Sequence, residues 1–197
     1  MTKIGFIRHG STPWNIEGKA QGWCDIPLNN DGIVDANRLA QRLLSEDWDI
    51  IYSSDLIRAH HTANIIAEKM MKTVYLDSRL REIAGGLMEG TTEEERILKW
   101  GSGWRELDLQ IESDDRVLSR GITFINEICE KHPNENVLIV SHGSFLKKII
   151  KKLIPNEPFE ESLLNTSITL LQRDTIGWNC PLFNCTKHIV LTNREVT

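Results

Sequence analysis

The sequence predicts an α/β fold with three layers, in which helices cover both faces of a mainly parallel central sheet and a small helical lid is inserted. One pattern in the sequence predicts it. Apolar runs of strand length alternate along the chain with segments whose apolar residues recur at helical spacing. Chains that alternate strands with helices in this way build parallel sheets covered by helices. The 197 residues suffice for a single domain over 1–197, with a lid or subdomain insert near 77–112.

The first half of the chain supplies three expected strands and two expected helices. In order, they are a strand at 3–7, a loop at 9–30, a helix at 29–44, a strand at 49–54, a helix at 55–71 and a strand at 73–76. The helix over 29–44 begins with asparagine and aspartate, which favour helix starts, and Ile33, Leu39 and Leu43 recur on one face. The helix over 55–71 has the same spacing.

The second half continues the alternation after an irregular stretch. The expected elements are a helix at 114–131, a strand at 136–141, a helix at 144–154 and strands at 167–173 and 188–192. The apolar stripe of 144–154 leaves an opposite face that is expected to be solvated and carries Lys147, Lys148, Lys151 and Lys152. The segment 77–112 has no clear period, which makes it the candidate lid. Its Trp100 and Trp104 either form an apolar wall for a ligand or pack in a small core.

Composition and charge exclude several classes of protein. Apolar residues make up 40% and charged residues 26%, and the formal net charge is −5, so we expect no global attraction to nucleic acid or to acidic membranes. No apolar stretch approaches membrane-spanning length, and the N-terminus has no secretory pattern. Four scattered cysteines without a C-x-x-C pair favour reduced thiols. We therefore expect a cytoplasmic monomer or homodimer in which the positive charge for any anionic ligand is local.

Two histidines follow two of the expected strands. Arg8 and His9 come where the first strand ends, and His142 comes where the strand at 136–141 ends. In an open α/β sheet, ligands bind at the carboxyl ends of the strands. If these two strands are neighbours, both imidazoles face one crevice.

The residues around the histidines are suited to binding a phosphate. Gly10 and Gly143 allow the backbone to approach a ligand closely. The helix that begins near Ser144 aims free amides and a partial positive charge at the strand end, which is typical of anion sites. Arg8 offers a bidentate fork for phosphoryl oxygens, and Arg58 lies in the first turn of the helix after another strand. The ligand predicted from these residues is a small phosphorylated metabolite.

Five segments of the chain, in order, resemble the histidine phosphatase superfamily, the phosphoglycerate mutase-like proteins. These segments are "RHGSTPWN", "GWCDIPLNNDG", "YSSDLIRAHHTA", "LREIAGGLMEG" and "VLIVSHG". The likeness spans roughly residues 3–150. One arginine–histidine–glycine triplet is weak evidence, but five segments in the family's order and spacing are strong evidence.

The resemblance implies a role for each central residue. His9 would be the nucleophile, which attacks phosphorus and forms a phosphohistidine. Arg8, Arg58 and His142 would hold the phosphoryl group and stabilise the charge of its transition state. Glu82 would protonate the leaving oxygen and then activate water.

The resemblance also implies a set of binding residues, and it leaves two carboxylates to compare for the role of the acid. Glu89 is the rival of Glu82 for the acid role, but the motif favours Glu82, and Glu89 is expected to shape the loop before Gly90. The residues expected to contact the phosphate or the rest of the substrate are Asn15, Gln21, Gly22, Gly143 and Ser144. No metal and no cofactor is required, because arginines and histidines balance the charge.

The family contains phosphatases and mutases, and two features favour a phosphatase. The stretch between Glu82 and His142 is short and holds few paired basic residues, whereas mutases carry a longer insert there. The segment "LREIAGGLMEG" also resembles the phosphatase branch. We therefore expect a metal-independent phosphomonoester phosphatase, with a cofactor-dependent phosphoglycerate mutase as the alternative. A non-catalytic phosphate-binding module is an alternative of another class, but it has no need of the Glu82 carboxylate.

One departure from the family is Ile111, which stands before Glu112 where related phosphatases often have glycine.

Overall fold

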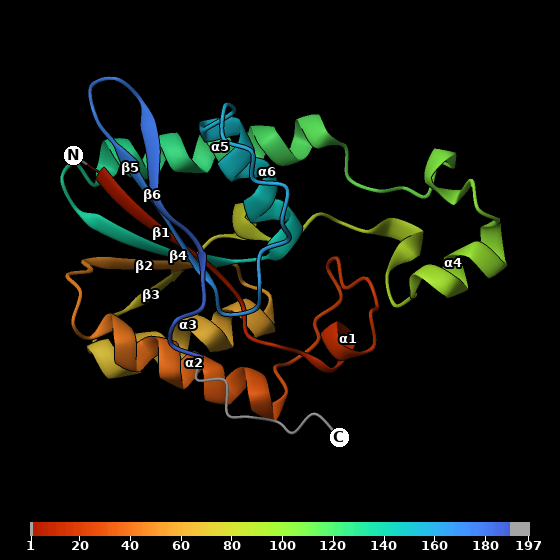
Figure 1. Ribbon diagram of the computed structural model, residues 1–197, viewed down its shortest axis with the longest axis horizontal. Coiled ribbons are helices and arrows are strands. Elements are labelled where there is room, and N and C mark those ends of the chain that lie inside the picture. The colour runs from red at the N-terminus through yellow and green to blue at the C-terminus, as the bar shows by residue number, and fades with distance from the viewer. Residues whose placement is uncertain (1, 190–197) are drawn as a thin grey trace.

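The computed structural model describes residues 2–189, which form an α/β fold around one sheet (Figure 1). Within these residues, six strands pair in the order β3-β2-β4-β1-β5-β6. Their bounds are β1 Thr2–Arg8, β2 Ile50–Ser53, β3 Val74–Leu76, β4 Asn136–Ser141, β5 Ile168–Arg173 and β6 Trp178–Cys185. The four strands β3, β2, β4 and β1 are parallel, and β5 and β6 add an antiparallel hairpin beside β1. The expectation of a mainly parallel sheet is confirmed.

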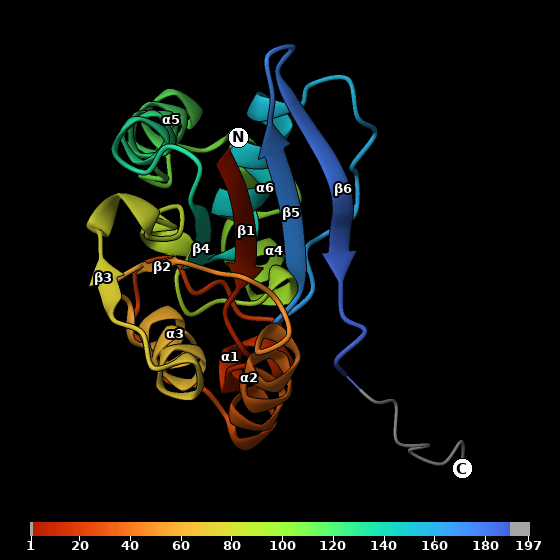
Figure 2. The same ribbon diagram turned by 90° about the vertical axis from the view of Figure 1, so that its left-hand side faces the viewer.

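Helices cover both faces of this sheet, so the three-layer prediction is confirmed as well (Figure 2). The helices are α1 Pro13–Ile16, α2 Asn30–Leu43, α3 Ile57–Met70, α4 Glu93–Trp100, α5 Asp114–Lys131 and α6 Gly143–Leu153. A core around Leu39 and Ile66 lies between the sheet and the α2–α3 pair. A second core around Phe124 and Leu146 lies between the opposite face and the α5–α6 pair. The long helices begin and end within two residues of their predicted bounds.

The expected lid segment is built from short pieces. It holds α4 and three 3-10 helices, η1 Ser78–Leu80, η2 Gly86–Met88 and η3 Trp104–Glu106. In Figure 1, α4 lies apart from the two helical layers, beyond the same end of the strands as α1. No helix within residues 2–189 is long and apolar enough to cross a bilayer.

The prediction of a last strand at 188–192 is contradicted at its first two residues. His188 and Ile189 lie in a turn region, and residues 190–192 lie outside the described part of the chain. The strand instead runs over Trp178–Cys185 and pairs with β5 through a tight turn, in which Asp174 Oδ1 accepts hydrogen bonds from the amides of Ile176 (2.8 Å) and Gly177 (3.0 Å). Polar residues and Pro181 interrupt the apolar pattern of this strand, so the sequence does not reveal it. An edge strand tolerates proline because one of its edges forms no hydrogen bonds to a neighbouring strand.

Sheet order determines where the site can form. β1 and β4 are neighbours, and their register places Arg8 opposite Ser141. β2 lies on the other side of β4, with Ser53 opposite Val140. Because these three strands are parallel, the residues that follow them meet at one edge of the sheet.

Candidate active site

The imidazoles of His9 and His142 lie side by side at this edge, as strand adjacency requires. Their ring centroids are 5.2 Å apart, and the two residues are 3% and 0% exposed. The first strand and the strand before α6 are therefore neighbours, and the expected crevice holds both rings.

His9 is held as a neutral imidazole with one free nitrogen. Its Nδ1 donates to the carbonyl of Gly10 (2.7 Å), which leaves Nε2 as the unprotonated nitrogen. Burial lowers the pKa of His9 well below its usual range, and the charges of Arg58 and Arg8 lower it further. The surrounding backbone is fixed too, because Asn165 Nδ2 donates to the carbonyl of His9 at 3.0 Å.

His142 is neutral for the same reasons. Burial lowers its pKa well below the usual range, and the charge of Arg58 is the second largest cause of this lowering. Its Nε2 shares a hydrogen bond with the Ser54 hydroxyl at 2.9 Å. Its buried Nδ1 has no hydrogen-bond partner within residues 2–189.

The two arginines stand beside the histidines and are fixed by backbone carbonyls. Arg58 is completely buried, donates to the carbonyls of Cys24 and Gly22 at 2.8 Å each, and has its pKa lowered by burial to about 10. Arg8 Nη1 donates to the carbonyl of Leu163 at 2.5 Å. In the described part of the chain, the buried Nε atoms of both arginines have no partner. Buried donors are rarely left without a partner, so these nitrogens are a donor set suited to an anion.

A cavity of about 500 Å³ joins most of the predicted residues. The predicted residues that line it are Arg8, His9, Asn15, Gln21, Gly22, Arg58, Glu82 and Ser144. Gly143 and His142 are not among the described residues that line it. A Cβ on Gly143 would stand 3.1 Å from Arg8 Nε, so glycine there leaves room for the guanidinium.

Asn15, Gln21 and Gly22 differ in how free they are to bind a ligand. The Oδ1 of Asn15 accepts hydrogen bonds from Thr12, and this caps α1. The Gln21 Oε1 is buried without a partner in the part of the chain that the structure describes. The carbonyl of Gly22 is used by Arg58, so Gly22 positions the arginine.

Glu82 corrects one expectation about the start of α6. Its Oε1 accepts hydrogen bonds from the amides of Phe145 (2.8 Å) and Ile83 (2.9 Å), and its Oε2 accepts from the Ser144 amide (3.2 Å). The group at this helix N-terminus is therefore the Glu82 side chain, and the amides of Ser144 and Phe145 are not left open for a phosphate. The sequence did not reveal this because Glu82 comes from an irregular segment whose direction no period predicts.

Glu89 lies in the loop framework, as expected for the rival carboxylate. Its Oε1 accepts from the amides of Trp23 (2.9 Å) and Gly85 (2.8 Å), which ties two loops together. Gly22 has a φ of +48°, and a Cβ there would stand 2.0 Å from Glu89 Oε1. The Glu89 carboxylate is therefore enclosed by backbone, and Gly22 is needed beside it.

The cavity also holds charged residues that sequence reasoning missed. Lys19 and Lys148 line it together with Glu112 and Asp114. Lys148 lies on the face that was expected to be solvated, and its position near the start of α6 also brings Nζ within 2.8 Å of Asp114 at the cavity wall. Nothing but tertiary structure distinguishes it from Lys151.

The tryptophans of the lid segment pack with their neighbours. Trp104 is buried, donates from Nε1 to Glu93 (3.1 Å), and lies against Arg96 and Arg105. Neither Trp100 nor Trp104 is among the described residues that line the cavity. Of their two predicted roles, the small core is the one that Trp104 has. Across residues 2–189, no group of three or more histidine, cysteine, aspartate or glutamate residues is arranged to hold a metal ion.

We expect the rings of His9 and His142 to stay neutral in acid. Because burial and the arginine charges lower the folded pKa of both rings, the folded chain binds fewer protons than the unfolded chain below about pH 6.5. Their contribution to stability is full above that pH and is lost as the pH falls below it. In an NMR titration, both ring signals should keep their neutral positions from about pH 8 to about pH 5.5, while the histidines of the urea-unfolded chain titrate near the ordinary histidine pKa of about 6.5. A midpoint near 6.5 for either folded ring would contradict the buried geometry.

The chain resembles known proteins over nearly its whole length. The family model described as histidine phosphatase superfamily (branch 1) matches residues 4–186. The chain is 34% identical to phosphoglycerate mutase-like protein 4 of Arabidopsis thaliana, with 95% of this chain and 86% of the relative covered. It is 30% identical to a metal-independent phosphoserine phosphatase of the same plant, with 96% and 84% covered.

Solved structures agree with the sequence relatives. The phosphoserine phosphatase of Entamoeba histolytica, solved in complex with 3-phosphoglyceric acid, matches with a TM-score of 0.82 and 36% identity, over 96% of this chain and 100% of that chain. The same phosphatase, as a mutant solved with phosphoserine, matches with the same TM-score at 34% identity. The paired histidines, the buried arginines and these matches lead to one conclusion: the chain is an enzyme that belongs to branch 1 of the histidine phosphatase superfamily.

Proposed function

We propose that the protein is a metal-independent phosphomonoester phosphatase that acts on small organic phosphates through a phosphohistidine at His9. The observation that carries this proposal is the neutral His9 ring, with its free Nε2 in a cavity shared with Arg8, Arg58 and Glu82. The cavity volume of about 500 Å³ suits a small metabolite. The two arginines supply the positive charge that a phosphoryl group needs.

In the first half-reaction, His9 Nε2 attacks phosphorus and forms a P–N bond while the ester P–O bond breaks. The proton for the leaving oxygen comes from the Glu82 carboxyl, so an alcohol departs and Glu82 becomes a carboxylate. Oε1 already accepts two amides, whereas Oε2 has one contact at 3.2 Å. We therefore assign the transferred proton to Oε2.

In the second half-reaction, water replaces the alcohol. The Glu82 carboxylate takes a proton from water, the water oxygen attacks phosphorus, and the P–N bond breaks. Inorganic phosphate leaves, His9 returns to the neutral ring, and Glu82 is again protonated. Arg8, Arg58 and His142 hold the phosphoryl oxygens through both steps, and preorganised donors of this kind stabilise the transition state.

The charges at the cavity wall favour a substrate that carries a carboxylate as well as a phosphate. Lys19 and Lys148 provide two cations beyond the arginine pair, and Asp114, whose side chain is exposed beside Lys148, provides an acceptor for an amino group. The solved relatives hold phosphoserine and 3-phosphoglyceric acid, which are small phosphorylated acids. We infer that this chain prefers esters of the same class.

Replacement of Lys148 tests this preference. We expect Lys148→Met to raise KM for phosphoserine or 3-phosphoglycerate by about threefold to fivefold, because a partly exposed ion pair is worth up to about 1 kcal/mol. KM for p-nitrophenyl phosphate, which has no carboxylate, should stay the same. Lys151→Met is the matched control, one turn further along α6, where the ammonium pairs with Glu160. Equal changes for both substrates would reject a carboxylate contact by Lys148.

The test of the function itself is phosphate release from a panel of small phosphomonoesters in the presence of EDTA. We expect release by the wild type, and the best ester identifies the substrate class. The panel includes 3-phosphoglycerate, and the same samples are assayed for interconversion of 2- and 3-phosphoglycerate. Interconversion much faster than phosphate release would make the protein a mutase, and the absence of both reactions would contradict the proposal.

A further inference from the structure

The segment that carries Glu82 is held by side chains from elsewhere in the fold. Residues 79–84, here called the acid segment, run from η1 toward η2. Four consecutive carbonyls in it, those of residues 79 to 82, accept hydrogen bonds from side chains. Ser141 Oγ donates to the carbonyl of Leu80 (2.6 Å), and Arg120 donates to the other three carbonyls.

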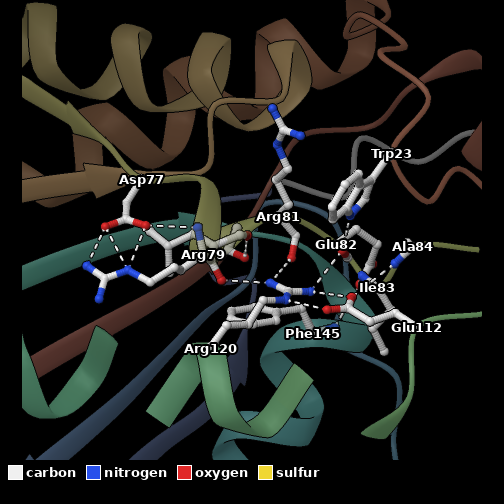
Figure 3. A network of polar contacts seen from close by, with 12 residues as sticks. Trp23, Asp77, Arg79, Arg81, Glu82, Ile83, Ala84, Glu112, Arg120 and Phe145 are labelled. Atoms are coloured by element: carbon white, nitrogen blue, oxygen red, sulfur yellow. Dashed lines mark hydrogen bonds and ion pairs between the residues drawn. The ribbon is translucent and has the colours of Figure 1, made fainter. Parts of the chain in front are cut away.

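Arg120, on α5, uses all five of its N–H donors in this network (Figure 3). Its Nη1 donates to the carbonyls of Arg79 (2.6 Å) and Arg81 (2.7 Å), and its Nη2 donates to the carbonyl of Glu82 (3.0 Å). Nε and Nη2 also form a bidentate pair with the carboxylate of Glu112, at 2.8 and 2.9 Å. A guanidinium has five such donors in a rigid fork, so none is left over.

The contacts of Arg120 link it to the backbone just after Glu82 and to Phe145, which binds the Glu82 side chain. Glu112 Oε2 accepts from the amide of Ala84 (3.2 Å), and the amide of Glu112 donates to the carbonyl of Ala84 (2.9 Å). The guanidinium lies over the Phe145 ring, 4.6 Å from its centroid, and the amide of Phe145 donates to Glu82 Oε1. Arg120 thus shares the carbonyl of Glu82 with Trp23 Nε1, which donates to it at 2.7 Å, and it also packs on the residue that binds the Glu82 side chain.

We propose that Arg120 is the positioning residue for the general acid: it holds the acid segment so that the Glu82 carboxyl stays on the amides of Ser144 and Phe145 beside His9. This inference rests on the role of Glu82 in the proposed function. Both side chains of the Arg120–Glu112 pair are largely buried, at 15% and 7% exposed. Lysine cannot replace the arginine, because an ammonium lacks the planar fork that serves three carbonyls and a carboxylate at once.

The choice of leaving group separates positioning of the acid from general damage to the fold. An alkoxide, as in phosphoserine, is a poor leaving group and needs the proton of Glu82. p-Nitrophenolate leaves without a proton, so its phosphate ester still requires His9 and the arginines but does not require the acid. Because kcat/KM reports the steps up to formation of the phosphoenzyme, comparison of the two esters isolates the acid.

The experiment measures kcat/KM of Arg120→Met for both esters. We expect a fall of about 100-fold for phosphoserine and of less than about threefold for p-nitrophenyl phosphate, since general acid catalysis contributes at least about 100-fold. Glu82→Gln provides the reference and should give the same pattern. Arg116→Met is the matched control: it lies one turn earlier on α5, lines the same surface pocket as Arg120, and should change neither value by more than about twofold.

Arg120→Lys keeps the test decisive if Arg120→Met does not fold. It retains the positive charge opposite Glu112 and should show the same selectivity for the alkyl ester, with a smaller loss. Equal losses for both esters, or no loss, in the folded variant would overturn the proposal. So would a Glu82→Gln variant without leaving-group selectivity. If the wild type releases phosphate from neither ester, it is the proposed function that fails, and Arg120 is then not the cause.

Discussion

Replacement of His9 by alanine is expected to lower kcat/KM by about five to six orders of magnitude, the loss typical of a covalent nucleophile. Its Nε2 is the unprotonated nitrogen of a buried ring in the cavity, because Nδ1 is committed to the carbonyl of Gly10. Nothing within the described site duplicates this position. His142 is 5.2 Å away by ring centroids, but its Nε2 is engaged by Ser54.

The measurement is steady-state phosphate release, with near-ultraviolet circular dichroism as the test of folding. His61→Gln is the matched control, since His61 is not among the described residues that line the cavity, and it should retain full activity. If folded His9→Ala kept more than about 1% of the wild-type kcat/KM, His9 would not be the nucleophile.

Replacement of Arg58 by lysine or methionine is expected to lower kcat/KM by about 100-fold to 1000-fold, as for loss of one preorganised donor. Arg58 is completely buried and reaches the carbonyls of Gly22 and Cys24 with two different nitrogens. An ammonium cannot bond both carbonyls and still present a donor to the phosphoryl group. Lysine should therefore not rescue the rate.

The two Arg58 variants should differ in one readout. The charge of Arg58 contributes to lowering the pKa of both His9 and His142. Arg58→Met removes that charge, so both folded pKa values should rise toward the usual range in an NMR titration. Arg58→Lys keeps the charge and should hold them down. Unchanged histidine titration in Arg58→Met would show that burial and the charge of Arg8 keep the rings neutral without Arg58.

The positions of the paired histidines could be predicted because they depend on strand ends. The apolar run before Arg8 and the run before His142 mark two buried strands, and parallel strands end at the same edge of a sheet. The position of Arg58 could be predicted by the same rule, because it lies in the first turn of the helix after β2. The resemblance to a known family added Glu82, which no periodicity singles out.

The supporting residues could not be predicted, because their partners are distant in sequence. Asn165 holds the carbonyl of His9, and Thr62 accepts from the amide of Gly10, yet each is an ordinary polar residue in the sequence. Lys148 and Lys151 have the same local pattern, and only the fold brings one of them to the cavity. Arg120 likewise has no signal beyond its place on an amphipathic helix. Sequence patterns identify elements and their ends, whereas these contacts arise from how irregular segments pack.

The most direct test of the account is to look for the phosphoenzyme. Wild-type protein is mixed with its best phosphomonoester, quenched in alkali within a single turnover, and analysed as the intact chain and as peptides by mass spectrometry. The account predicts one added phosphoryl group on His9, formed at least as fast as phosphate is released and absent from His9→Ala. Turnover without any phosphoryl group on His9, or with the group on another residue, would contradict the account.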